Sequence, residues 1–154
     1  MRYLLPAALI LALGAGFAQS QGGSDKPAPV KARQGIMQNY AFSIGTLGGM
    51  AKGEVEYDAQ AAQAAADRLV ALSSLPQTGY WPEGTSSDDL EGVKALPAIW
   101  ENMDDFTSGF DTLNEAAMAM ADVASDGQQA VAGQMQPLGK SCGACHEDYQ
   151  MSDD

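Results

Sequence analysis

Residues 128–151 read QQAVAGQMQPLGKSCGACHEDYQM and contain both cysteines and the only histidine of the 154-residue chain. Cys142, Cys145 and His146 form a C-x-x-C-H motif, which is the spacing of covalent haem attachment. In that chemistry both thiols add across the haem vinyl groups as thioethers, and the imidazole becomes an axial ligand of the iron. On a helix the three positions are i, i+3 and i+4, so their side chains share one face. The motif therefore predicts one covalently attached haem c.

Three other interpretations of the two cysteines are weaker. A thioredoxin-like C-x-x-C pair follows a strand in a βαβ pattern, whereas this pair lies late in a segment rich in Ala, Met and Gln. A structural zinc site normally uses four Cys or His ligands, and the whole chain has three. A disulfide suits an exported protein, but it gives no reason for His146 to follow the second cysteine.

Residues 1–18 have the features of a secretory signal peptide. An arginine is followed by an apolar run at residues 4–13, and then by the small residues Gly16 and Ala18 at the positions that cleavage requires. The apolar run is shorter than the roughly 20 residues of a membrane-spanning helix. We therefore expect cleavage before Gln19, export to the periplasm, and no membrane association after cleavage.

The chain is strongly acidic, with a formal net charge of -12. The predicted signal peptide contains one charged residue, Arg2, so its removal changes the net charge from -12 to -13. Nucleic acids and anionic membrane surfaces are themselves negative, so neither is an expected partner. The charge favours either a basic partner or simple solubility, and it does not identify a partner.

The rest of the chain predicts helices. A tether rich in Gly, Ser and Pro occupies residues 19–29. In the first helical segment the apolar residues recur at spacings of three and four. Asp58 is a typical N-cap for the second segment, and Pro76 ends it. The four predicted helical segments are residues 30–53, 59–75, 93–124 and 128–151.

The later segments are separated by recognisable breaks. A loop rich in Gly, Pro, Ser and Asp is predicted at residues 77–92. Pro97 is tolerated near the start of the third helix. Ser125 to Gln128 has the spacing of a capping box, and Pro137 is expected to kink the fourth helix. Because no segment alternates with period two, the fold class is all-α, an antiparallel four-helix bundle over residues 30–154 with covalently bound haem.

Several motifs outside the C-x-x-C-H run resemble the class II cytochromes c, the group that contains cytochrome c′ and its low-spin, methionine-ligated relatives. The resemblance covers nearly all of the chain after the signal peptide. It rests on Arg33-Gln34-Gly35-Ile36-Met37, Met50-Ala51-Lys52-Gly53-Glu54 with Tyr57-Asp58, Trp81-Pro82-Glu83-Gly84, Pro97-Ala98-Ile99-Trp100 with Phe106, and Met135-Gln136-Pro137-Leu138-Gly139-Lys140.

The resemblance assigns roles to two residues of the first helix. Met37 stands where the low-spin members place their second axial ligand, and Arg33 matches an arginine near a haem propionate. The two are four residues apart, so they share a helix face. Met37 could instead be core packing, and Arg33 a solvated charge. Gln150 stands where family members commonly have an arginine close to the proximal face, which argues against a proximal gas-binding role.

The sixth iron ligand separates the candidate functions. With one histidine in the chain, the position opposite His146 is held by methionine, by another weak ligand, or by nothing. A thioether ligand favours the ferrous state and closes the site. We expect an electron carrier, not an enzyme, with Met37 as ligand. The alternative is a five-coordinate cytochrome c′ that binds nitric oxide or carbon monoxide, and a thiol redox protein without haem is the third hypothesis.

The expected partners follow from these functions. They are redox proteins of unknown identity and the cytochrome c maturation machinery, which attaches haem outside the cytoplasmic membrane. The family resemblance is also compatible with a homodimer formed through the first two helices. A monomer is also compatible with the sequence, because helix faces rich in alanine suit contacts inside a bundle as well as between two chains.

Overall fold

The computed structural model describes residues 26–152. The predicted signal peptide, 1–18, and residues 19–25 of the predicted tether lie outside the described residues. Among the described residues all regular elements are helices, and one isolated antiparallel bridge pairs Ala95 with Gln150. The helices are α1 (Ala28–Lys52), α2 (Ala59–Ser73), α3 (Ala98–Glu101), α4 (Met103–Ala121) and α5 (Gln128–Tyr149).

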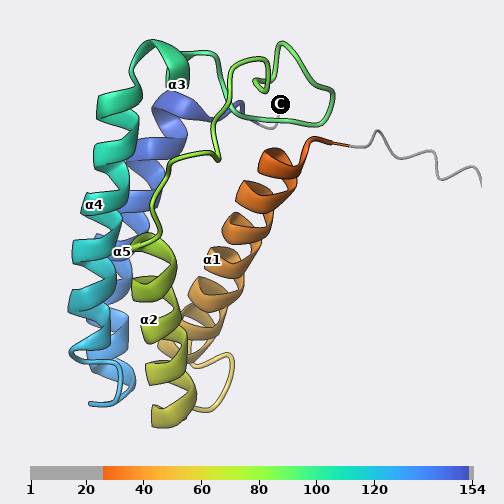
Figure 1. Ribbon diagram of the computed structural model, residues 1–154. Helices are drawn as coiled ribbons and strands as arrows, with labels where there is room; N and C mark the ends of the chain where they lie inside the picture. The colour runs from red at the N-terminus through yellow and green to blue at the C-terminus, as the bar shows by residue number, and fades with distance from the viewer. Residues whose placement is uncertain (1–25, 153–154) are drawn as a thin grey trace, which may run out of the picture.

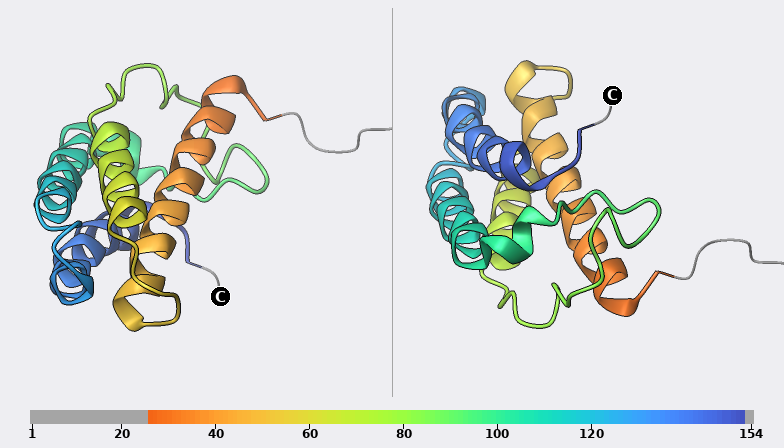
Figure 2. Two further views of the ribbon diagram at one scale, coloured as in Figure 1. Left: turned by 90° about the horizontal axis from the view of Figure 1, so that it is seen from below. Right: turned by 90° about the horizontal axis from the view of Figure 1, so that it is seen from above.

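Four long helices form an antiparallel bundle, as predicted (Figure 1). Helix α1 packs against α2 and α5, and α4 packs against the same two helices. The loop between α2 and α3 lies over one end of the bundle, between α3 and the start of α1 (Figure 2). The opposite end contains the two short connections, α1 to α2 and α4 to α5 (Figure 1).

Helix α1 begins two residues earlier than predicted, at Ala28, so residues 28 and 29 belong to the bundle and not to a tether. Pro29 lies in its first turn, where a missing N–H costs nothing. The helix ends as expected beside Gly53, which adopts the left-handed conformation with φ 72° and donates its N–H to Met50 O at 3.0 Å.

Helix α2 begins as the sequence predicts. The Asp58 carboxylate accepts a hydrogen bond from the Ala61 N–H at 2.8 Å, which satisfies one of the free donors at the helix start. The helix ends at Ser73, two residues before the predicted end, and Pro76 follows in the loop.

The prediction of one helix over residues 93–124 was wrong. The structure has the short α3 and then α4, separated at Asn102, whose φ of -132° and ψ of 45° are not helical. The Asn102 side chain donates to Ala98 O at 3.2 Å, the same carbonyl that accepts from the Asn102 backbone N–H at 3.0 Å. Residues 93–97 belong to the loop, and Pro97 is the residue before α3.

Helix α5 begins at Gln128, as predicted, and ends at Tyr149, two residues before the predicted end, but its N-terminus is not capped as expected. Gly127, with φ 122°, precedes it, and no side chain caps its first turn, so the capping box was a wrong prediction. Helical structure is continuous through Pro137. The proline side chain is exposed, so its ring does not disturb the core.

Two groups of apolar side chains fill the bundle. The larger core joins α1, α2, α4 and α5, and its fully buried members include Leu47, Leu69, Met120 and Leu138. A smaller aromatic core around Phe106 lies where the long loop meets α3, α4 and the end of α5. Within residues 26–152 no helix has the length and apolar character required to cross a membrane.

Candidate haem site

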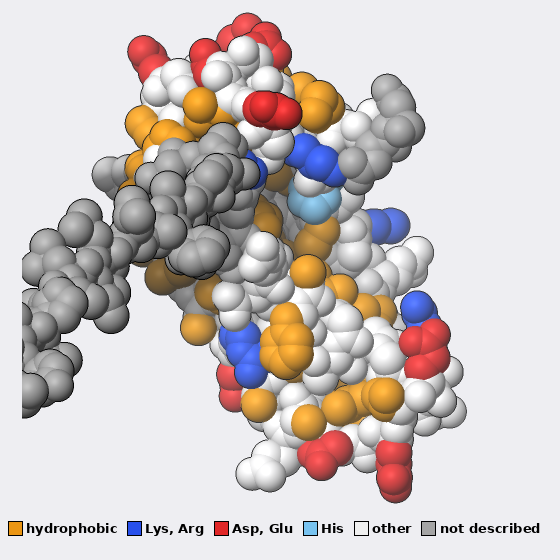
Figure 3. Space-filling model, turned by 90° about the vertical axis from the view of Figure 1, so that its right-hand side faces the viewer, with side chains coloured by type: hydrophobic (Ala, Val, Ile, Leu, Met, Phe, Trp, Pro, Cys, Tyr) orange, Lys and Arg blue, Asp and Glu red, His pale blue; other side chains and the backbone are white. Residues whose placement is uncertain are grey.

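The three motif residues lie on the last two turns of α5, at the end of the bundle that the long loop covers (Figure 1). Cys142 and Cys145 are half-buried and not joined in a disulfide, and His146 is exposed. Figure 3 shows the imidazole at the surface with hydrophobic side chains beside it. The predicted i, i+3, i+4 arrangement is therefore present, with both thiols and the imidazole beside one common cavity.

The first of these cavities, about 370 Å³, lies between α1, α4 and α5. Its α5 wall contains both cysteines and His146, and its α1 wall contains Met37, Tyr40, Ala41 and Ile44. On the α4 side, Gly109 faces Cys145 across the cavity wall. A Cβ added to this glycine would lie 3.9 Å from Cys145 Sγ, so its missing side chain leaves space beside the thiol. The lining is predominantly apolar, as is typical of cofactor sites.

A second cavity, about 640 Å³, adjoins the first and shares Met37, Cys145, His146 and Gln150 with it. It extends toward the long loop and is lined there by Arg33, Trp81 and residues 92–95. The two residues that the family resemblance singled out on the first helix therefore lie beside the same space as the C-x-x-C-H motif.

Arg33 is buried, with 4% of its surface exposed. Its guanidinium donates to Tyr80 O at 3.1 Å, to Thr85 Oγ1 at 3.0 Å and to Thr85 O, and it stacks over the Trp81 ring with Cζ 4.5 Å from the centroid. Burial lowers the pKa of Arg33, although a guanidinium keeps its charge at all ordinary pH values. The interpretation of Arg33 as a solvated surface charge was wrong.

No carboxylate of residues 26–152 forms an ion pair with this guanidinium. A buried cation without a counterion is costly. Carbonyl and hydroxyl oxygens supply part of the compensation, and Arg33 also borders the second cavity. An anionic group of a molecule bound in this cavity would balance the cation.

The electrostatics of the cysteines argue against a thiol redox role. Burial, first, and then the charges of Cys142, Asp148 and Asp105 raise the pKa of Cys145 to about 11. Burial also raises the pKa of Cys142. Reactive redox thiols have lowered pKa values, so these are not activated thiols. No group of three or more His, Cys, Asp or Glu side chains suited to a metal ion occurs in residues 26–152, so the zinc interpretation gains no support either.

The end of α5 is held in place by the long loop. Leu96 N–H donates to Tyr149 O at 3.0 Å, and Met151 N–H donates to Lys94 O at 2.8 Å. The Tyr149 hydroxyl donates to Asp105 Oδ2 at 2.6 Å, and this bond is the main cause that raises the pKa of Tyr149 to about 12. These contacts fix the helical turn that carries His146.

Sequence reasoning missed four residues of this site: Tyr40, Thr85, Gly109 and Tyr149. The spacing of Tyr40 from Met37, one helical turn, was a usable signal. The sequence around Thr85 and Gly109 contains no such signal, because the roles of these two residues depend on which elements the fold brings opposite them. Trp100 and Phe106 belong to the motifs that carry the family resemblance. Phe106 lies in the aromatic core and also borders the second cavity, whereas Trp100 Nε1 donates to Trp81 O at 3.0 Å.

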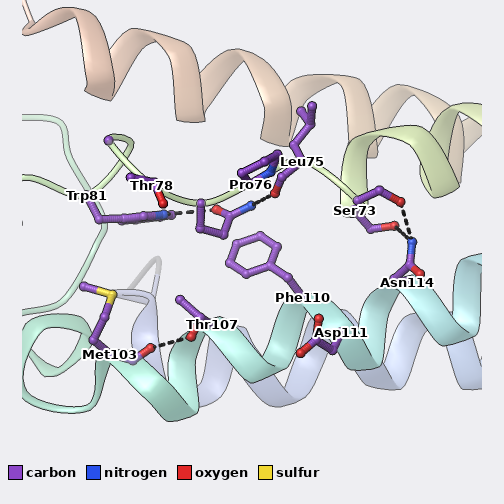
Figure 4. A pocket seen from close by; sticks show the side chains of 13 residues that line it. Ser73, Leu75, Pro76, Thr78, Trp81, Met103, Thr107, Phe110, Asp111 and Asn114 are labelled. Carbon is purple, nitrogen blue, oxygen red and sulfur yellow. Dashed lines mark hydrogen bonds between the residues drawn. The ribbon is translucent and has the colours of Figure 1, made fainter.

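Another cavity, about 670 Å³, lies on the other side of Phe110, between the loop after α2 and α4. Figure 4 shows the Phe110 side chain extending from α4 toward this loop. Asn114 donates to Ser73 Oγ at 2.8 Å and to Ser74 Oγ at 3.0 Å, so the polar groups there bond to one another. This cavity contains neither cysteine nor His146 and is not the haem site.

Comparison with known proteins agrees with this geometry. The family model described as Cytochrome C' matches residues 28–150. Cytochrome c-554 of Cereibacter sphaeroides is 39% identical over 99% of this chain and 100% of its own length. A cytochrome c' of the same organism is 36% identical over 98% of this chain and 99% of its own.

A solved structure leads to the same assignment. The cytochrome c' described as from "Rhodobacter Spheriodes" superposes with a TM-score of 0.77 at 37% identity, covering 81% of this chain and 96% of that one. The match by sequence and by structure extends over the bundle and the C-x-x-C-H motif. The chain therefore belongs to the cytochrome c′ family of class II cytochromes c, whose members bind covalently attached haem c.

Proposed function

We propose that this chain is a periplasmic monohaem electron carrier, with haem attached through Cys142 and Cys145 and iron ligated by His146 and Met37. One observation carries the proposal. Met37 from α1 and His146 from α5 line the same two adjoining cavities, and both cavities include a motif cysteine. Axial ligands on facing helices are the arrangement that a haem between them requires.

Each residue then has a defined task. When bound, the haem supplies a one-electron couple between ferric and ferrous iron. The two thiols would hold it as thioethers, each S–H adding across a vinyl double bond so that the sulfur gains a bond to carbon and the proton ends on the neighbouring carbon. His146 would provide an imidazole nitrogen, and the loop contacts at Tyr149 and Met151 fix the end of its helix.

Met37 is assigned to the opposite side of the iron. A thioether sulfur is a soft, weakly basic donor that favours the ferrous state and raises the reduction potential. Its side chain is 36% exposed and borders both cavities, so it is not an ordinary core methionine. Met120, by contrast, is fully buried in the larger core, as expected for packing.

Arg33 is assigned to a haem propionate. Its guanidinium is buried, borders the second cavity and has no carboxylate partner among the described residues. A charge-assisted hydrogen bond to a propionate would balance this cation. The same residue holds Tyr80 and Thr85 of the long loop, so it would connect the haem to the loop that covers it.

The deciding experiment is the optical spectrum of the purified holoprotein, oxidised and reduced, with carbon monoxide then added to the reduced form. We expect the long-wavelength ferric band of methionine–iron ligation, sharp reduced α and β bands, and no response to carbon monoxide. Met37→Ala should lose the ferric band and bind carbon monoxide. Met118→Ala is the matched control, because Met118 is 45% exposed on α4 and borders none of the cavities described above.

The opposite result would change the function. Broad high-spin bands that shift when carbon monoxide is added to the unmodified protein would show an open sixth position. Met37 would then be a wall residue, and nitric oxide or carbon monoxide binding would become the leading function.

Location and assembly remain predictions. Export to the periplasm rests on residues 1–18, outside the described residues. The homodimer through α1 and α2 would use outward side chains such as Phe42, which is 64% exposed and lies under the Arg68 guanidinium at 5.2 Å. Sedimentation of the holoprotein over a range of concentrations distinguishes monomer from dimer.

A further inference from the structure

The hydroxyl of Tyr40 is the sole buried side-chain nitrogen or oxygen within residues 26–152 that lacks a hydrogen-bond partner. The residue is 5% exposed and belongs to the larger apolar core. Buried polar groups in native proteins are almost always paired, and an unpaired one costs about 1–3 kcal/mol. An exception of this kind calls for a physical reason.

The position of Tyr40 suggests the reason. It is on α1, three residues after Met37, and both side chains line the 370 Å³ cavity opposite His146. The other α1 residues of that wall, Ala41 and Ile44, have no polar side-chain atoms. Tyr40 is therefore the polar side chain of the α1 wall that faces the motif across this cavity.

The hydroxyl is available as a donor. Burial, first, and then the neighbouring Cys142 raise the pKa of Tyr40 far above its ordinary value. The phenol consequently keeps its proton at neutral pH. Since Cys142 would be a thioether in the haem-bound protein, it would offer at most a weak acceptor.

We propose that the Tyr40 hydroxyl donates a hydrogen bond to the group that holds the sixth iron position, and so acts as a positioning residue for that ligand. This inference rests on the proposed function, because the sixth position exists only in the haem-bound chain. With Met37 in place, the acceptor is the thioether sulfur. Hydrogen bonds from outside the ligand set tune redox potentials in metal sites generally.

The direction of the effect follows from electron donation. A hydrogen bond to the Met37 sulfur withdraws electron density that would otherwise stabilise ferric iron, so it favours the ferrous state. Tyr40→Phe keeps the ring and removes the donor. It should lower the ferrous-to-ferric ratio at a fixed electrode potential by about twofold to tenfold, the range expected for one hydrogen bond. That is a decrease in reduction potential of roughly 18 to 59 mV at 59 mV per tenfold.

Tyr57→Phe is the matched control. The Tyr57 hydroxyl donates to Ala124 O at 2.9 Å and accepts from Gly127 N at 3.1 Å, at the bundle end away from the motif. The same chemical change there should lower thermal stability and leave the potential unchanged. Tyr40→Phe should do the reverse, changing the potential while the holoprotein keeps its melting temperature and its methionine–iron band.

The two variants separate the possible outcomes. An unchanged potential in Tyr40→Phe, with the methionine–iron band of the unmodified protein intact, overturns the inference while the proposed function stands. If the unmodified protein instead binds carbon monoxide, the proposed function fails and the ligand at the sixth position is the gas. In that case Tyr40→Phe should release carbon monoxide about twofold to tenfold faster, and an unchanged release rate overturns the inference.

Discussion

The two ends of the bundle are built differently. At the end with the short connections, the larger core continues to Met120 and Ala124, both fully buried, and Tyr57 pairs with Ala124 O and Gly127 N. At the end covered by the long loop, two adjoining cavities separate α1 from α5. That end also holds a buried guanidinium without a carboxylate partner in the described residues, and the unpaired hydroxyl of Tyr40.

The difference shows at which end of the bundle a bound cofactor would contribute to the stability of the fold. We call the end with the short connections the closed end and the end covered by the long loop the open end. At the closed end the apolar side chains named above are buried, and the Tyr57 hydroxyl is paired within the chain. The open end has features that would each cost free energy in a finished core, namely cavities, an unbalanced cation and an orphan donor. All three lie where a covalently held, partly anionic haem would supply the missing contacts.

The largest effect expected concerns the open end. In a Cys142→Ser, Cys145→Ser variant neither thioether can form, so haem should be lost completely on denaturation. Mass spectrometry of the intact chain measures this. Gly143→Ala lies between the two cysteines, where an added Cβ meets nothing within 4 Å, and it should keep its haem. Covalent haem in the double variant would contradict the assigned attachment sites.

A cavity made in the larger apolar core should affect stability without changing the haem. Leu69 of α2 is fully buried and borders neither haem cavity. Leu69→Ala should lower the free energy of unfolding by about 2–5 kcal/mol, measured by denaturant titration, with an unchanged optical spectrum. The exposed Met118→Ala should change it by no more than about 0.5 kcal/mol. A spectral change in Leu69→Ala would show that the larger core and the haem site are coupled.

Arg33→Gln tests the buried cation of the open end. It removes the bonds to Tyr80 O and Thr85 and the contact with Trp81, and should cost about 1–3 kcal/mol of unfolding free energy. Arg68→Gln is the comparison, because Arg68 bonds Ser43 Oγ at 3.2 Å and covers the exposed Phe42. Its cost should be below about 1 kcal/mol. Equal losses in the two variants would remove the special role given to Arg33.

The smallest effect concerns pH. The bond to Asp105 raises the folded-state pKa of Tyr149 to about 12, while an unfolded tyrosine ionises near pH 10. The folded chain thus binds more protons between these values, so this stabilisation is fully present below about pH 10 and is lost as pH rises to about 12. Stability measured across that range should fall less in Tyr149→Phe than in the unmodified protein. Parallel decreases would show that Tyr149 does not contribute.

The sequence predicted the fold well where local signals were unambiguous. Asp58 as an N-cap, Gly53 at a helix end and the apolar spacing of α1 gave the correct elements. The prediction was wrong at Asn102, whose non-helical backbone separates α3 from α4, and at Ser125, which does not cap α5. The hydrophobic pattern reports which face of a segment is buried, and it does not report a local break of the backbone or which residue caps a helix.

By itself, the sequence determined the identity of the motif residues, their shared helix face and the all-α class, because these depend on spacings of three and four along one chain. Only the tertiary structure decided that Arg33 is buried against the long loop, that Met37 and His146 line common cavities, and that the Tyr40 hydroxyl is unpaired. Burial and pairing depend on which groups from distant segments are brought together, and chain spacing does not contain that information.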